Sequence, residues 1–136
     1  MNRLIIVGSP RTNGRSAHLA NMLFETCIEE CPDDELALAP VSTLSVAGCT
    51  GCDACRDNIA KLAELGEDAI GDDFAPCAID DDMQEIYELI DAADEITVVS
   101  PVYFAGPPSQ LKALLDRLQP YYWTNARAEE KRPAVL

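Results

Sequence analysis

Apolar residues along the chain occur both in short continuous runs and in longer stretches with helical spacing. Residues 4–7 (LIIV) form an uninterrupted apolar run, which is typical of a strand buried on both faces of a parallel sheet. Residues 36–41 predict a second strand, and the largely β-branched run 96–100 predicts a third. Residues 132–136 resemble the beginning of a fourth strand. The predicted strands are thus separated by long connecting segments.

Three of these connections have the apolar spacing of helices, at residues 16–30, 83–93 and 109–118. A shorter helix is indicated around residues 59–65. Alternating strands and helices predict an α/β fold, a doubly wound parallel sheet in three layers. We expect a single domain over residues 1–136, with a cysteine loop and an acidic insertion at 47–79. Because the fourth strand barely begins, we expect the chain to be an N-terminal portion that lacks the last strands.

Length, net charge and cysteine content exclude several classes of function and partner. The 136 residues allow one domain with a core, and the formal net charge of −14 makes nucleic acid and anionic membranes poor partners. No apolar run approaches the roughly 20 residues of a membrane span, and the N-terminus lacks a signal-peptide core, so we expect a cytoplasmic protein. Six cysteines in such a chain favour free thiols, a metal ion or a cluster over disulfides.

The loop at residues 8–16 (GSPRTNGRS) follows the first predicted strand and precedes the first predicted helix. Unpaired N–H groups and the dipole at a helix N-terminus attract anions, and the loop adds hydroxyl, amide and guanidinium donors. It lacks the lysine of a Walker loop and the three glycines of a dinucleotide-binding fingerprint. Two hypotheses remain: an anion cradle, or an ordinary turn in which Ser16 caps the helix.

A second loop, residues 100–106 (SPVYFAG), follows the third predicted strand. Its aromatic residues suit a flat ligand, although they could instead form a hydrophobic plug over the end of the sheet. Because carboxyl ends of neighbouring parallel strands share one edge, we expect the two loops to lie close together.

Four motifs in sequence order resemble those of the flavodoxin-like, NAD(P)H-dependent FMN reductase family, and in particular its iron–sulfur flavoprotein branch. They are GSPRxNGxS from Gly8, DDM from Asp81, SPVYF from Ser100 and LKxxxDR from Leu111. The resemblance covers nearly the whole chain. It implies an FMN cofactor, NAD(P)H as co-substrate and, commonly, a homo-oligomer.

By motif, the resemblance also implies which residues bind the flavin. The FMN phosphate would be held by Ser9, Arg11, Thr12, Asn13, Gly14 and Ser16. The isoalloxazine ring would be lined by Pro101, Val102, Tyr103, Phe104 and Gly106. Because the flavin carries the chemistry, no catalytic side chain is expected.

The cysteine loop contains Cys49, Cys52 and Cys55 in a C-x2-C-x2-C pattern, which suits a 4Fe–4S cluster if a fourth ligand is available. Members of the resembling branch carry four cysteines in a compact run, whereas the fourth candidate here, Cys77, follows a long insertion. A zinc site, or four reduced cysteines with no metal, are the alternatives.

Three hypotheses on function follow. The first is an FMN-dependent oxidoreductase that takes electrons from NAD(P)H and passes them to a quinone, a flavin or a ferredoxin-like protein. The alternative is a non-catalytic electron carrier of the flavodoxin or iron–sulfur flavoprotein type. A truncated, inactive remnant is a third possibility.

Overall fold

The computed structural model describes residues 1–66, 74–124 and 134–135. Its strands are β1 (Asn2–Val7), β2 (Glu35–Pro40), β3 (Glu95–Val99) and β4 (Ala134–Val135). They form a parallel sheet in the order β2-β1-β3-β4. The predicted parallel α/β arrangement is therefore confirmed. Of the predicted fourth strand, residues 132, 133 and 136 lie outside the described residues.

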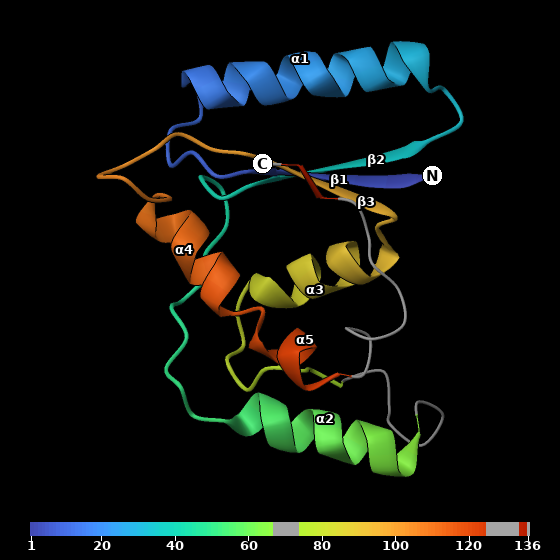
Figure 1. Ribbon diagram of the computed structural model, residues 1–136, viewed down its shortest axis with the longest axis vertical. Coiled ribbons are helices and arrows are strands. Elements are labelled where there is room, and N and C mark those ends of the chain that lie inside the picture. Colours follow the sequence, from blue (N-terminus) through green and yellow to red (C-terminus); the bar gives the residue numbers. More distant parts are fainter. Residues whose placement is uncertain (67–73, 125–133, 136) are drawn as a thin grey trace.

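The helices are α1 (Arg15–Glu30), α2 (Ala54–Leu65), α3 (Met83–Ala92), α4 (Ser109–Asp116) and the short α5 (Gln119–Trp123). Figure 1 shows α1 on one face of the sheet and α3 and α4 on the other, with α2 and α5 farther out on that second side. The three predicted long helices agree with α1, α3 and α4 within one or two residues at each end. Helix α2 begins earlier than the apolar spacing indicates, and α5 was not predicted.

Strand β1 lies between β2 and β3 and is buried on both faces, as its continuous apolar sequence predicts. Leu4 and Ile6 pack in the core formed with α3 and α4, whereas Ile5 and Val7 pack with Ala20 of α1. Strand β2 lies at the edge of the described sheet, where a proline is tolerated because one side of the strand needs no ladder hydrogen bonds. This explains why Pro40 can end the strand paired with Val7.

No described helix has the combination of length and apolar character needed to cross a lipid bilayer.

Candidate functional site

The loop after β1 is joined closely to the end of β3. The Gly8 N–H donates a hydrogen bond of 2.8 Å to the carbonyl oxygen of Val99. A Cβ atom at Gly8 would lie 2.4 Å from Cδ2 of Leu111 and 2.8 Å from the Ser100 hydroxyl. A glycine is therefore needed where β1, β3 and α4 meet. The expectation that the loops after β1 and β3 share one edge of the sheet is confirmed at this point.

The first turn of α1 has no side-chain cap. Gly14 occupies the N-cap position and Ser16 is already the second residue of the helix, so the alternative in which Ser16 caps the helix is wrong. The buried Ser9 hydroxyl stabilises the preceding loop instead, because it accepts a 3.1 Å hydrogen bond from the Arg11 N–H. The first-turn N–H groups thus have no side-chain acceptor and can receive an anion. Nearby exposed donors are Arg11, Thr12 and Asn13.

The loop after β3 ends in a tight turn that displays its side chains. Tyr103 and Gly106 exchange backbone hydrogen bonds of 2.8 and 3.1 Å, and the two residues between them, Phe104 and Ala105, have φ of 45° and 62°. Positive φ at both central residues is the pattern of a type I′ turn, which normally favours Asn and Gly.

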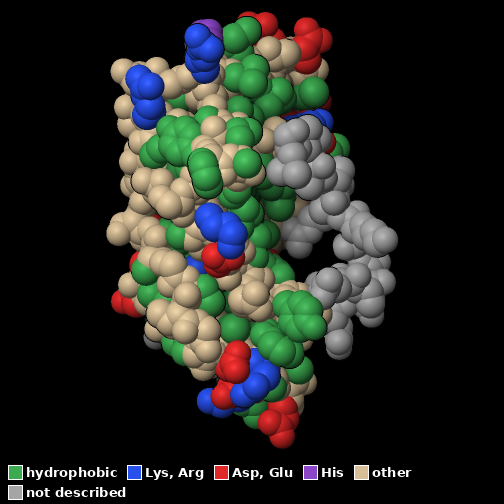
Figure 2. Space-filling view, turned by 60° about the vertical axis from the view of Figure 1, so that its left-hand side comes forward, with side chains coloured by type: hydrophobic (Ala, Val, Ile, Leu, Met, Phe, Trp, Pro, Cys, Tyr) green, Lys and Arg blue, Asp and Glu red, His purple; other side chains and the backbone are tan. Residues whose placement is uncertain are grey.

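The aromatic residues of this turn do not cover the sheet. Phe104 is fully exposed, and Val102 and Tyr103 are 77% and 44% exposed. The hydrophobic-plug alternative is therefore wrong, because a plug would bury these side chains. Figure 2, in which the left-hand side of Figure 1 comes forward, shows hydrophobic side chains gathered on the surface with a few basic ones among them.

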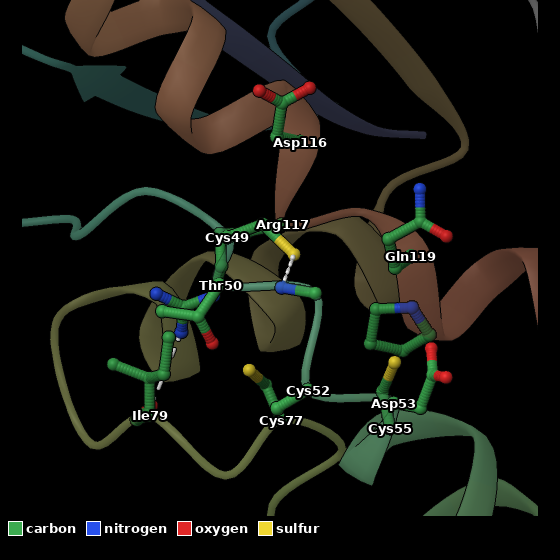
Figure 3. A pocket seen from close by; sticks show the side chains of 12 residues that line it. Cys49, Thr50, Cys52, Asp53, Cys55, Cys77, Ile79, Asp116, Arg117 and Gln119 are labelled. Carbon is green, nitrogen blue, oxygen red and sulfur yellow. Dashed lines mark hydrogen bonds between the residues drawn. The ribbon is translucent and has the colours of Figure 1, made fainter.

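A second feature is a pocket of about 310 Å³ on the side of α4 and α5. All four cysteines of the predicted metal set contribute to its lining, together with Arg117, Gln119 and Pro120. Figure 3 shows that Cys77 lies at the same pocket as Cys49 and Cys52 of the preceding loop and Cys55 of the first turn of α2. The remaining cysteines, Cys27 and Cys31, lie on and just after α1 and do not line the pocket.

The thiols of the pocket have distinct environments. The backbone N–H of Ala54 and the Thr50 hydroxyl lower the pKa of Cys52 by stabilising its thiolate. Burial, first of all, raises the pKa of Cys55, and the negative charges of Cys77 and Cys49 raise it further. Cys49, Cys55 and Cys77 all line this pocket.

Within residues 1–66, 74–124 and 134–135, no group of three or more His, Cys, Asp or Glu side chains is placed to hold a metal ion. Four thiols around a cavity have the donor chemistry of a polynuclear cluster, because a cluster fills the space between its ligands.

The model of a known family, described as NADPH-dependent FMN reductase, matches residues 1–136 of this chain. The chain belongs to the NADPH-dependent FMN reductase family. It is similar to proteins named iron-sulfur flavoprotein from Methanosarcina thermophila (39% identity over 112 residues) and Archaeoglobus fulgidus (30% over 123 residues). These alignments cover 82% and 89% of this chain but 49% and 47% of the relatives, so the chain spans about half the length of the curated relatives it matches.

Solved structures agree on a flavodoxin-like α/β fold. Smu.1420 from Streptococcus mutans is 18% identical with a TM-score of 0.57, and the alignment covers 86% of this chain and 52% of that one. The apo form of an NADH:FMN oxidoreductase is 22% identical with a TM-score of 0.52, covering 85% and 48%. At these identities the likeness shows the fold.

In this FMN reductase family member, the predicted site residues fall into two separate places. The residues predicted to bind phosphate and the ring lie in the loops after β1 and β3 and, for Ser16, in the first turn of α1, at one edge of the sheet. The four predicted metal ligands lie together in the pocket beside α5. Helix α4 connects the two places, because it begins after the aromatic turn and ends next to Arg117 of the pocket wall.

Sequence reasoning missed the role of Arg117 and Asp81. The Arg117 side chain is completely buried and forms a two-pronged ion pair with Asp81, at 2.8 and 3.1 Å. Asp81 belongs to the acidic run 80–82, yet its side chain is only 11% exposed. The available signal was the family motifs, DDM from Asp81 and LKxxxDR from Leu111, which contain both residues. In the second motif, Lys112 and Asp116 form an exposed ion pair.

Proposed function

We propose that this chain binds FMN at the edge formed by the loops after β1 and β3 and serves flavin-dependent oxidoreduction. NAD(P)H is the proposed electron donor, and a quinone, a flavin or a ferredoxin-like protein is the acceptor. The observation that carries the proposal is the uncapped N-terminus of α1 beside an exposed aromatic turn, at the ends of two hydrogen-bonded strands.

The phosphate end of the proposed site fits its ligand in charge and in backbone geometry. The first turn of α1 contains no acidic residue and no side-chain cap, so its N–H groups are available to a dianion. Arg11 and Arg15 flank this turn, and both are exposed. The chain has a net charge of −14, so two arginines four residues apart around a helix N-terminus are a local positive charge that suits a phosphate.

The ring end of the proposed site fits in shape and polarity. A flat tricyclic ring buries apolar area against aromatic and aliphatic side chains, and Val102, Tyr103 and Phe104 offer such area without being covered by the described part of the chain. Bound FMN supplies the hydride and electron-transfer chemistry, and the protein holds and orients it. Accordingly, we assign binding roles to these residues and a catalytic role to none.

We further propose that Cys49, Cys52, Cys55 and Cys77 hold an iron–sulfur cluster. Their placement on one pocket supports this, as do the names of the relatives, although those proteins extend well beyond the matched segment. Anaerobically isolated protein should contain iron and show the broad visible absorbance of a cluster. Protein without iron and without that absorbance would leave four reduced cysteines as the better interpretation.

The flavin proposal is tested by calorimetric titration with FMN and with riboflavin, which lacks the phosphate. We expect FMN to bind at least tenfold more tightly, because a charge-assisted phosphate contact contributes about 1.5–3 kcal/mol. Arg11→Gln should weaken FMN binding without changing riboflavin binding. Lys61→Gln, which removes an exposed cation of α2 far from the loop, is the matched control. Equal affinities for FMN and riboflavin would contradict the proposal.

The electron-carrier alternative predicts different kinetics. With FMN bound, steady consumption of NADPH or NADH in the presence of a quinone supports an oxidoreductase. Reversible one-electron reduction by a protein partner, without turnover of the nicotinamide, supports a carrier.

A further inference from the structure

Cys77 is 22 residues beyond Cys55 in the sequence, yet both line the same pocket. Local spacing cannot place Cys77, whereas Cys49, Cys52 and Cys55 lie within seven consecutive residues, in the loop before α2 and its first turn. Some tertiary contact must therefore hold the segment around Cys77 against that loop. The described residues contain a buried set of interactions that joins these two segments.

Arg117, immediately after α4, contacts both cysteine segments. Its Nη1 donates a 3.0 Å hydrogen bond to the carbonyl oxygen of Ala47, two residues before Cys49. Its Nη2 donates a 3.2 Å hydrogen bond to the carbonyl oxygen of Ile79, two residues after Cys77. A single guanidinium therefore links the two segments next to their cysteines.

Asp81 completes this link. Its carboxylate pairs with both terminal nitrogens of Arg117 and also accepts a 2.8 Å hydrogen bond from the Ala47 N–H. Next to it, the Asp82 carboxylate accepts a 2.6 Å hydrogen bond from the Ser45 N–H. The segment after Cys77 is thus fastened to the beginning of the cysteine loop by charged groups, and we call the Arg117–Asp81 ion pair with these backbone partners the clamp.

The burial of the clamp makes it rigid. The Arg117 side chain has no exposed surface, and its Nε lacks a hydrogen-bond partner among the described residues. The backbone carbonyl of Arg117 also accepts a 2.5 Å hydrogen bond from the Tyr87 hydroxyl of α3. A guanidinium held by a planar carboxylate at two points has little freedom to move, and lysine cannot reproduce this fork.

We propose that the clamp positions Cys77 opposite Cys49, Cys52 and Cys55, so that a fourth thiol from a distant segment completes the cysteine centre. Arg117 and Asp81 are thus positioning residues, and this inference rests on the proposed function of the cysteines. It explains how the chain can dispense with a compact run of four cysteines. It also assigns a function to the buried ion pair, since buried pairs by themselves contribute little net stability.

The test uses the double variant Arg117→Met with Asp81→Leu, which removes both charges together and leaves neither one buried alone. Metal-free, reduced protein is treated with a short bifunctional maleimide, and peptide mapping measures the yield of cross-links between Cys77 and the loop cysteines. Wild-type protein should give these cross-links. The folded double variant should give about fivefold less, because the effective concentration of Cys77 near the loop falls.

Two further variants exclude a general effect on the fold. Lys112→Met breaks the exposed Lys112–Asp116 ion pair of α4, the helix that precedes Arg117, and should cross-link like wild type. Arg117→Lys keeps the positive charge but cannot pair with Asp81 at two points, so it should also lose most of the Cys77 cross-link. This variant provides the test if the double variant does not fold. Wild-type cross-linking in either folded clamp variant, or no Cys77 cross-link in wild type, would overturn the inference.

Measuring iron binding distinguishes a failure of the clamp from a failure of the proposed iron–sulfur cluster. After anaerobic reconstitution with iron and sulfide, wild type should retain iron and the clamp variants should retain substantially less per chain. Cross-linking that depends on the clamp, in a wild-type protein that retains no iron, would support the clamp and contradict the cluster. If wild type retains iron, equal retention in the folded clamp variants would overturn the positioning role.

Discussion

At the scale of single residues, the candidate flavin site depends on positions where the packing leaves no room for even one additional atom. Gly8 is the clearest case, since a Cβ there would lie 2.4 Å from Cδ2 of Leu111 and 2.9 Å from Cβ of Ser100. The first predicted strand must end in a residue without a side chain, so that α4 and the β3 loop can approach the proposed phosphate loop. The sequence shows this glycine, but only the structure shows that neighbouring side chains require it.

Gly8→Ala should therefore destabilise the fold by about 1–3 kcal/mol, the usual cost of forcing extra atoms into a packed site. Urea denaturation measures the free energy of unfolding. Gly48→Ala is a suitable control, because a Cβ at Gly48 would meet nothing within 4 Å. If both substitutions change stability equally, close packing at Gly8 is not the reason for its glycine.

Asp81 should make stability depend on pH in the acid range. Burial raises the pKa of its carboxyl, but the hydrogen bonds from Arg117, Ala47 and Met83 outweigh burial and hold the pKa below its usual range. Its stabilising contribution is complete above the unfolded-state pKa, about 3.9, and is lost as the pH falls through the lower folded-state pKa.

The expected result is a difference in unfolding free energy between wild type and Asp81→Asn that is large at pH 7 and narrows below about pH 4. Urea midpoints measured between pH 3 and pH 7 would reveal it. Asp80→Asn, at an exposed neighbouring position, controls for the general effect of removing an acidic residue. A wild-type advantage over Asp81→Asn that stays constant with pH would show that ionisation of Asp81 is not involved.

At the scale of elements, α4 connects the two parts of the proposed site. It follows the aromatic turn, and the residue after its end is the arginine of the clamp. Eight helical residues extend about 12 Å. The helix therefore holds the proposed flavin site, at the loops after β1 and β3, a short and fixed distance from the cysteine pocket. The amphipathic sequence predicted this helix but not its connecting role, which depends on the residue that follows its last turn.

The turn before α4 is another element that the sequence specifies poorly. Phe104 and Ala105 adopt positive φ, a conformation that costs about 1–2 kcal/mol for each residue with a Cβ. Nothing in the letters Phe-Ala predicts a type I′ turn, because the usual signal is Asn-Gly. The conformation displays both aromatic side chains of the turn, which agrees with a binding role for this loop.

Ala105→Gly should stabilise the fold by roughly 0.5–1 kcal/mol, since relief of the positive φ exceeds the entropy that glycine adds to the unfolded chain. The same substitution in α4, Ala113→Gly, should instead destabilise it by about 1 kcal/mol. Thermal and urea unfolding of both variants give the comparison. A loss of stability in Ala105→Gly similar to that of Ala113→Gly would contradict the assigned turn.

At the scale of the whole molecule, the sequence was sufficient for the order of strands and helices and insufficient for long-range placement. Continuous apolar runs and helical spacing are local features of a sequence, so β1, α1 and α3 were predictable from them. No local pattern predicts that Asp81 pairs with Arg117, 36 residues away, or that Cys77 lines the same pocket as Cys49, 28 residues away. Residues 67–73, the middle of the expected acidic insertion, lie outside the described residues.

The large negative charge is itself a property of the whole molecule and should oppose folding. With 24 acidic and 10 basic side chains, repulsion between distant carboxylates destabilises the compact state, whereas local pairs such as Arg3 with Asp34 stabilise it. Salt shortens the screening length from about 10 Å at 0.1 M to about 3 Å at 1 M and therefore weakens the long-range repulsion more than the close pairs.

The free energy of unfolding in urea should accordingly rise as sodium chloride increases from 0.05 to 1 M. The double variant Glu29→Lys with Glu30→Lys should show a smaller rise, because it makes the net charge less negative by four units, two for each substitution. Both residues are exposed in the last turn of α1, which contains no basic residue, so the lysines should also interact better with the helix dipole, by about 0.3–1 kcal/mol each at low salt. A stability that falls with salt would mean that close ion pairs, rather than overall repulsion, dominate the electrostatics of this fold.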